Sequence, residues 1–103
     1  MLTDTVLNRF RTAPGAIYGA RLARVVLYGS RARGDQRADS DYDVAVSLWD
    51  MPNRSQELRR LSDAETEILP DTGAVITALP FPVEAYAERT GFMGEVRREG
   101  VEL

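Results

Sequence analysis

Three residue types with distinctive chemistry are absent from this 103-residue chain: cysteine, histidine and lysine. Without cysteine there is neither a disulfide framework nor a thiol nucleophile, and without histidine there is no imidazole base and no usual zinc site. Without lysine there is no P-loop lysine and no Schiff base. Any chemistry must therefore use carboxylates, hydroxyls, arginine and backbone amides, and any metal must be a hard cation held by oxygen.

Long apolar segments are missing as well. No stretch approaches the roughly 20 apolar residues that a membrane-spanning helix needs, and no signal-peptide pattern opens the chain. Because nothing points to secretion or to a membrane, we expect a cytoplasmic protein. The length suits one domain and is too short for two, so we expect a single domain over residues 1–103. Its small core would gain from a partner subunit, which leaves a homo-oligomer open.

The charges are unevenly distributed along the chain. Residues 1–37 carry a net charge of +5, residues 38–103 carry −8, and the whole chain carries −3. An acidic chain argues against general nucleic-acid binding, which usually needs a basic face. The arginine-rich first third is better suited to a compact polyanion such as a nucleoside triphosphate.

Hydrophobic periodicity predicts two main helices. The first should follow Thr3 and Asp4, which can cap a helix start, and end at Pro14–Gly15. The second should begin after the capping residue Asn53 and end within residues 70–73, where proline and glycine occur together. One or two short helices should follow near the C-terminal end.

Three short apolar runs predict strands. They cover residues 25–28, 42–48 and 74–79, and Pro80 and Pro82 should close the last of them. The order helix, strand, strand, helix, strand, helix predicts an α/β (α+β) fold with a small sheet backed by helices. The strand order stays open at this point.

The segment 25–46 holds the residues that carry chemistry. Gly29 and Ser30 follow a buried strand, where glycine lets the backbone approach a phosphate and the hydroxyl can donate to it. Asp41 and Asp43 lie two residues apart in the next strand, so both carboxylates share one face about 6.6 Å apart along the chain. Two carboxylates so close repel each other unless a cation compensates them. Mg²⁺, or Mn²⁺ in its place, would do so together with triphosphate oxygens.

This segment resembles a known signature. Gly29-Ser30-Arg31-Ala32-Arg33-Gly34, followed by Asp41-Tyr42-Asp43 with ten residues between the Gly-Ser and Asp-x-Asp pairs, is similar to the minimal nucleotidyltransferases of the DNA polymerase β-like superfamily. The resemblance implies a mixed sheet with helices packed on one side and metal-dependent transfer of a nucleoside monophosphate from ATP or another triphosphate. It also implies a HEPN-type toxin as partner, which such antitoxins neutralise, in some cases by adding AMP to it.

The same resemblance assigns roles to particular residues. It implies that nucleotide binding falls to Gly29, Ser30, Arg31 and Arg33, and that metal binding and catalysis fall to Asp41 and Asp43.

One departure from the family pattern is important. The family has a third carboxylate on the next strand, and residues 74–79 contain no acid. Asp71, Glu84 and Glu88 lie nearby in sequence, but none is at the expected position. Three interpretations follow: an active nucleotidyltransferase, a binding module that neutralises a HEPN-type partner by contact alone, or a subunit to which a partner supplies the missing acid.

Overall fold

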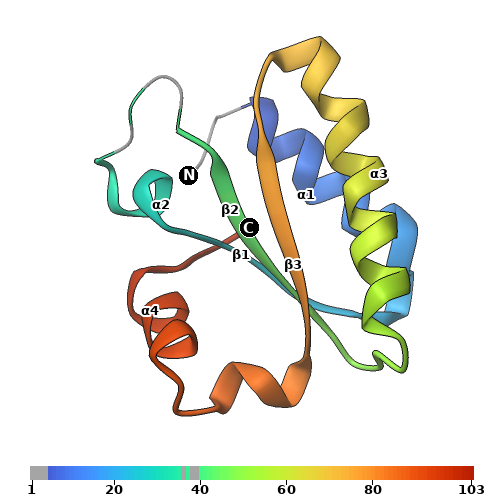
Figure 1. Ribbon diagram of the computed structural model, residues 1–103, viewed down its shortest axis with the longest axis vertical. Helices are drawn as coiled ribbons and strands as arrows, with labels where there is room; N and C mark the ends of the chain where they lie inside the picture. The colour runs from blue at the N-terminus through green and yellow to red at the C-terminus, as the bar shows by residue number, and fades with distance from the viewer. Residues whose placement is uncertain (1–4, 36, 38–39) are drawn as a thin grey trace.

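A four-stranded mixed sheet forms the centre of the protein (Figure 1). The computed structural model describes residues 5–35, 37 and 40–103. The strands lie in the order β3-β2-β1-β4, with β1 antiparallel to both β2 and β4, and β2 parallel to β3. Their bounds are Leu22–Tyr28 for β1, Tyr42–Leu48 for β2, Ile76–Pro82 for β3 and Val101–Glu102 for β4.

Helices cover both faces of this sheet. The two long helices, α1 (Thr5–Tyr18) and α3 (Arg54–Thr72), lie side by side on one face. The opposite face is partly covered by η2 (Val83–Ala87) and α4 (Gly91–Glu99). Two short elements complete the chain, η1 (Gly19–Arg21) before β1 and α2 (Ser30–Arg33) after it.

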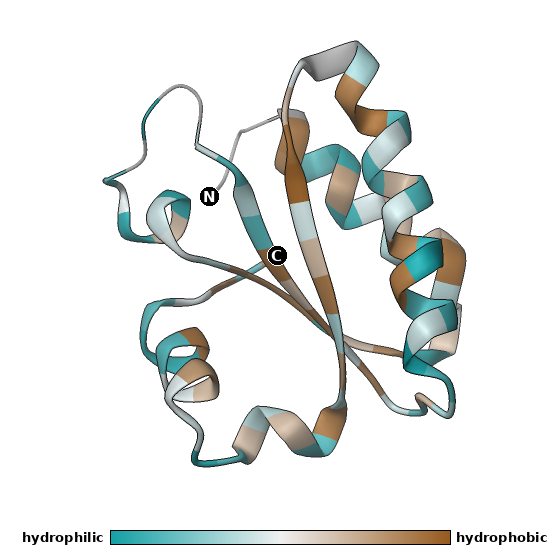
Figure 2. Cartoon of the chain, viewed as in Figure 1, coloured by the Kyte–Doolittle hydropathy of each residue, from teal (hydrophilic) through white to brown (hydrophobic). Residues whose placement is uncertain are grey.

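The predicted fold class is confirmed, with one correction. Packing on one side holds for α1 and α3 only, because Met93 and Val96 of α4 are buried against β1 and β2 on the other face. This explains why both central strands are apolar at nearly every position instead of alternating. Figure 2 shows the resulting contrast between the mostly hydrophobic central strands and the more hydrophilic α2.

One helix end differs from the sequence prediction. Pro14 lies inside α1, which continues to Tyr18, whereas α3 contains Pro70 and ends at Thr72, within the predicted range 70–73. A proline removes one backbone donor, but the Pro14 ring is fully buried, so its packing offsets that loss. Gly73 then ends α3 in the left-handed conformation, with its N–H donating to Leu69. The predicted caps of the first helix, residues 3 and 4, lie outside the described residues.

The third strand begins at Ile76, later than predicted, and it continues through both prolines to Pro82 because it is an edge strand. The N–H of Ala78 points away from β2 and donates to the carboxylate of Glu65 on α3, at 2.8 Å. The backbone N–H groups of alternate residues in a strand point in the same direction. Pro80 and Pro82 therefore occupy positions at which an N–H would point away from β2, so the missing donor costs no bond between strands. The prolines therefore continue β3 and protect its open edge against pairing with another strand.

None of the helices in the described part of the chain is long and apolar enough to cross a membrane.

The edge contact of Glu65 yields a stability prediction. Ala78 is buried, so Glu65→Ala should leave its N–H without a partner and lower the free energy of unfolding by about 1–3 kcal/mol. Glu65→Gln keeps an oxygen acceptor and removes the charge of a carboxyl group whose pKa is raised by burial. Its free energy of unfolding at pH 7 should therefore fall much less. Urea unfolding of the two variants is the measurement. Equal losses would show that the hydrogen bond to Ala78 does not stabilise the strand.

Candidate functional site

Gly29 brings the end of β1 against the carboxylate of Asp43. Its backbone has φ 77° and ψ −158°, a conformation open essentially to glycine alone. A Cβ atom at this position would lie 2.5 Å from Oδ2 of Asp43. Glycine is therefore required both by the backbone turn and by the close approach, which leaves the carboxylate oxygen uncovered.

The alternation of β2 separates the carboxylates from the main core. Tyr42 and Val44 are buried under α1 and α3, so Asp43 points to the opposite face. There Asp43 lies beside Tyr28 of β1 in the strand register. Asp41 is exposed and Asp43 is partly buried. Asp41 directly precedes β2, and its charge helps to raise the pKa of Asp43.

Electrostatics at Asp43 favour the neutral form of the carboxyl group. Burial raises the pKa of Asp43, and the negative charges of Asp41 and Glu95 raise it further, while Arg33 opposes them. Glu95 comes from α4, far away in sequence, and was not predicted. Because Arg33 offsets these negative charges only in part, the pKa of Asp43 stays raised, and a cation bound there would be stabilised. With one oxygen of Asp43 left open by Gly29, the residues fit a hard divalent cation.

The turn after β1 arranges the backbone around Ser30. The Gly29 carbonyl accepts hydrogen bonds from the N–H groups of Ala32 and Arg33, and the Ser30 carbonyl accepts from Gly34 and Asp35. The Ser30 side chain is half-buried, and its hydroxyl has no hydrogen bond to any part of the chain that the structure describes. It can therefore donate to a ligand.

The two arginines of the signature have different surroundings. Arg33 forms ion pairs with Asp35 at 3.2 Å, Glu99 at 3.1 Å and Glu95 at 3.7 Å. These pairs are at the surface, where an ion pair contributes little, so a phosphate could compete for the guanidinium. Arg31 instead reaches along the following segment toward the start of β2.

The strand register identifies the residue beside the carboxylates. Thr77 pairs with Asp43 and is exposed on the same face, at the position where a third carboxylate would complete the site. Glu84 and Glu88 follow the far end of β3, and the side chain of Asp71 is not described. Among the described residues, no group of three or more acidic side chains is arranged to hold a metal ion. The position of residue 77 beside Asp43 follows from the strand order and register, and not from the sequence alone.

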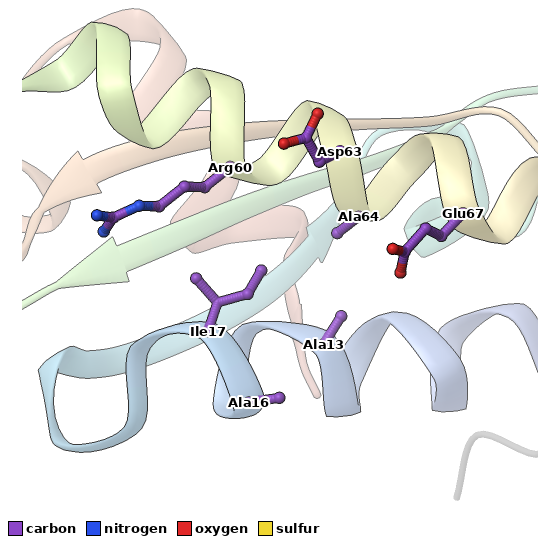
Figure 3. Close-up of a pocket in the computed structure, with 7 residues that line it drawn as sticks. All are labelled: Ala13, Ala16, Ile17, Arg60, Asp63, Ala64 and Glu67. Atoms are coloured by element: carbon purple, nitrogen blue, oxygen red, sulfur yellow. The ribbon is translucent and has the colours of Figure 1, made fainter.

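A groove lies elsewhere on the molecule. A groove of about 410 Å³ runs between α1 and α3, on the sheet face opposite the two carboxylates, and Figure 3 shows Ala13 and Ile17 of α1 pointing toward α3. Its lining contains none of the predicted site residues. The concentration of charge at Asp43, rather than the depth of a hollow, therefore locates the candidate site.

The raised pKa of Asp43 has a consequence for stability. A carboxyl group whose folded pKa lies above its ordinary value of 3.8 favours the folded state most at low pH, and this contribution is lost as the pH rises through the folded value. Asp43→Asn should therefore have a higher Tm than the wild type at pH 7 in EDTA, with the difference closing below pH 4. Thermal unfolding between pH 3 and 8 measures this, with the exposed Asp63→Asn as charge-matched control. A destabilised Asp43→Asn at pH 7 would contradict it.

Comparison with known proteins agrees with this geometry. The family model described as Polymerase beta, Nucleotidyltransferase matches residues 19–100. A curated relative from Methanocaldococcus jannaschii, with the provisional name protein adenylyltransferase MJ0141, is 29% identical over 98 residues, which cover 95% of each chain.

Solved structures show the same fold. A toxin–antitoxin crystal structure with AMP-PNP superposes with a TM-score of 0.69 at 17% identity, covering 92% of this chain and 69% of that one. The structure of a protein provisionally described as a minimal nucleotidyltransferase covers all of this chain and 97% of its own, with a TM-score of 0.64 at 22% identity. Since the family match spans most of its length, the chain belongs to the polymerase beta nucleotidyltransferase family.

Proposed function

We propose that this protein is a Mg²⁺-dependent nucleotidyltransferase that transfers a nucleoside monophosphate from a triphosphate to a hydroxyl group of a partner protein. The transferred group that we propose is AMP. The observation that supports the proposal is the close approach of Gly29 to the carboxylate of Asp43, the residues to which we assign phosphate binding and metal binding. AMP is favoured because the curated relative is named a protein adenylyltransferase.

Each residue has a part in this reaction. Gly29 and Ser30 would hold the β- and γ-phosphates, and Asp41 and Asp43 would bind Mg²⁺ or Mn²⁺. The bound metal would neutralise charge on the phosphates, as in other phosphoryl-type transfers. The acceptor oxygen forms a bond to the α-phosphorus while the bond from that phosphorus to the bridging oxygen breaks. Pyrophosphate leaves with the electron pair, and the hydroxyl proton passes to solvent.

The partner is proposed from the structural neighbours. Two of them, besides the one with AMP-PNP, are described as the toxin–antitoxin MntA-HpeT. We propose that the partner of this chain is likewise a toxin, of the HEPN type that the sequence signature implies, and that both act in the cytoplasm, where nucleoside triphosphates are available.

Binding of the triphosphate is the first test. Calorimetric titration of ATP should show saturable binding that needs Mg²⁺ and is lost in Asp41→Asn/Asp43→Asn. The double variant Asp63→Asn/Glu67→Gln removes the same charge from the groove between α1 and α3, so it should bind as the wild type does. The proposal fails if the folded wild type binds no triphosphate, or if the carboxylate variant binds as tightly as its control.

A second function is favoured by Thr77. With threonine beside Asp43, the site has two carboxylates where efficient transfer commonly relies on a fuller set. The chain would then bind Mg-nucleotide weakly or not at all and neutralise its partner by contact. Inhibition of the partner would in that case survive Asp41→Asn/Asp43→Asn, whereas transfer of AMP to the partner would require both acids.

Replacement of Thr77 tests whether the missing acid limits the site. A carboxylate about 5 Å from a divalent cation gains several kcal/mol at an effective dielectric constant near 20, part of which desolvation removes. Thr77→Asp should therefore bind Mg²⁺ roughly tenfold more tightly than Thr77→Asn, which has the same shape without the charge. In EDTA, Thr77→Asp should have the lower Tm because of repulsion from Asp43. Equal Mg²⁺ affinity of the two variants would show that residue 77 does not face the metal.

A further inference from the structure

We infer that Arg31 is a positioning residue that holds Asp41 in place for the metal, and not a direct phosphate ligand. This inference rests on the proposed function of the Gly29–Asp43 site. It assigns to Arg31 a different role from the nucleotide contact that the sequence signature implies.

The contacts of Arg31 converge on the chain around Asp41. Its Nε donates to the Ser40 carbonyl at 3.0 Å, and its Nη2 lies 3.5 Å from the Arg37 carbonyl. Its guanidinium carbon lies 4.0 Å from the ring centre of Tyr42. The head group thus touches both neighbours of Asp41, the residue before it and the residue after it.

The sheet explains why Asp41 needs this support and Asp43 does not. Asp43 is within β2 and is paired with Tyr28 on one side and Thr77 on the other. Asp41 precedes the first residue of β2, so no strand pairing holds it. Tyr42 is anchored, because its ring is buried and its N–H donates to the Val75 carbonyl. By stacking on Tyr42 and binding Ser40, Arg31 fixes the backbone on either side of Asp41.

The same contact joins the two halves of the site. Arg31 directly follows Ser30, so it moves with the turn proposed to hold phosphate, while its head group contacts the chain at the start of β2. A second set of bonds closes the segment between them, since the N–H of Arg37 donates to the Ser40 hydroxyl and the N–H of Ser40 donates to the Arg37 carbonyl. Arg31 therefore determines the spacing between phosphate turn and metal ligand.

This role depends on the shape of arginine. A guanidinium is planar, so it can lie on an aromatic ring while its edge donates in the plane to two carbonyl groups. A lysine ammonium is a point charge that cannot make both contacts at once. Arg31→Lys should consequently behave like Arg31→Ala, and a phosphate ligand held by charge alone would be rescued by lysine.

Metal-dependent binding tests the inference. Arg31→Ala and Arg31→Lys should each weaken Mg²⁺-dependent ATP binding by about 10- to 100-fold, the usual loss when a residue that orients a metal ligand is removed. The exposed Arg37→Ala removes the same charge from the same segment and should bind as the wild type does. Rescue by lysine, or an equal loss in Arg37→Ala, would overturn the positioning role.

A double-mutant cycle assigns the effect to one carboxylate. Arg31→Ala should cause little further loss of Mg²⁺-dependent binding in an Asp41→Asn background, because the ligand that it positions is already gone. In an Asp43→Asn background its effect should persist. Equal additivity in both backgrounds would indicate direct phosphate contact and would overturn the inference.

Hydrogen exchange provides a measurement that needs no nucleotide. In the free protein, Arg31→Ala should increase amide exchange at Ser40 and Tyr42, on either side of Asp41, at least tenfold, whereas Arg37→Ala and the wild type should agree and the amides of residues 44–46 should not change. Failure of the wild type to bind ATP would reject the proposed function but leave this result to judge Arg31. Unchanged exchange at both Ser40 and Tyr42 would overturn the positioning role by itself.

Discussion

The partly buried carboxylate of Asp43 is the constraint on which the rest of the site depends. Burial, Asp41 and Glu95 all oppose its ionised form, and Gly29 lies so close that no side chain fits between them. A fold maintains such an arrangement only when the surrounding packing is strong enough to offset it. Here β1 and β2 are buried on both faces, and their register holds Asp43 beside Tyr28. The packing of the apolar strands thus offsets the unfavourable free energy of the carboxylate at their end.

Three other features of the protein place charge and backbone around that carboxylate. The edge strand β3 brings Thr77 beside Asp43. The hydrogen bond from Ala78 to Glu65, together with the two prolines, limits pairing of this edge with other chains. Helix α4 contributes Glu95 from above the second face of the sheet. Arg33 connects α2 to the same helix through Glu95 and Glu99. The site is therefore assembled from segments that span most of the chain.

The two arginines show how similar residues acquire different roles. Both lie in one six-residue signature, and the sequence suggested nucleotide contact for each. Arg33 ends among exposed carboxylates, from which a phosphate could displace it, whereas Arg31 is engaged by backbone carbonyls and an aromatic ring. The difference arises from the direction in which a short helix presents successive side chains. Sequence spacing alone does not reveal it.

The sequence by itself determined the main elements and the face of β2 to which Asp43 belongs, because hydrophobic periodicity and alternation along a strand are local properties. It misjudged the ends at Pro14 and Pro80, where burial in one case and an edge position in the other make proline acceptable. Only the tertiary structure decided that Thr77 pairs with Asp43 and that Glu95 lies near Asp43. It also decided that Arg31 contacts the residues on both sides of Asp41. These relations join residues distant in sequence, and they depend on strand order and helix placement, which local patterns do not encode.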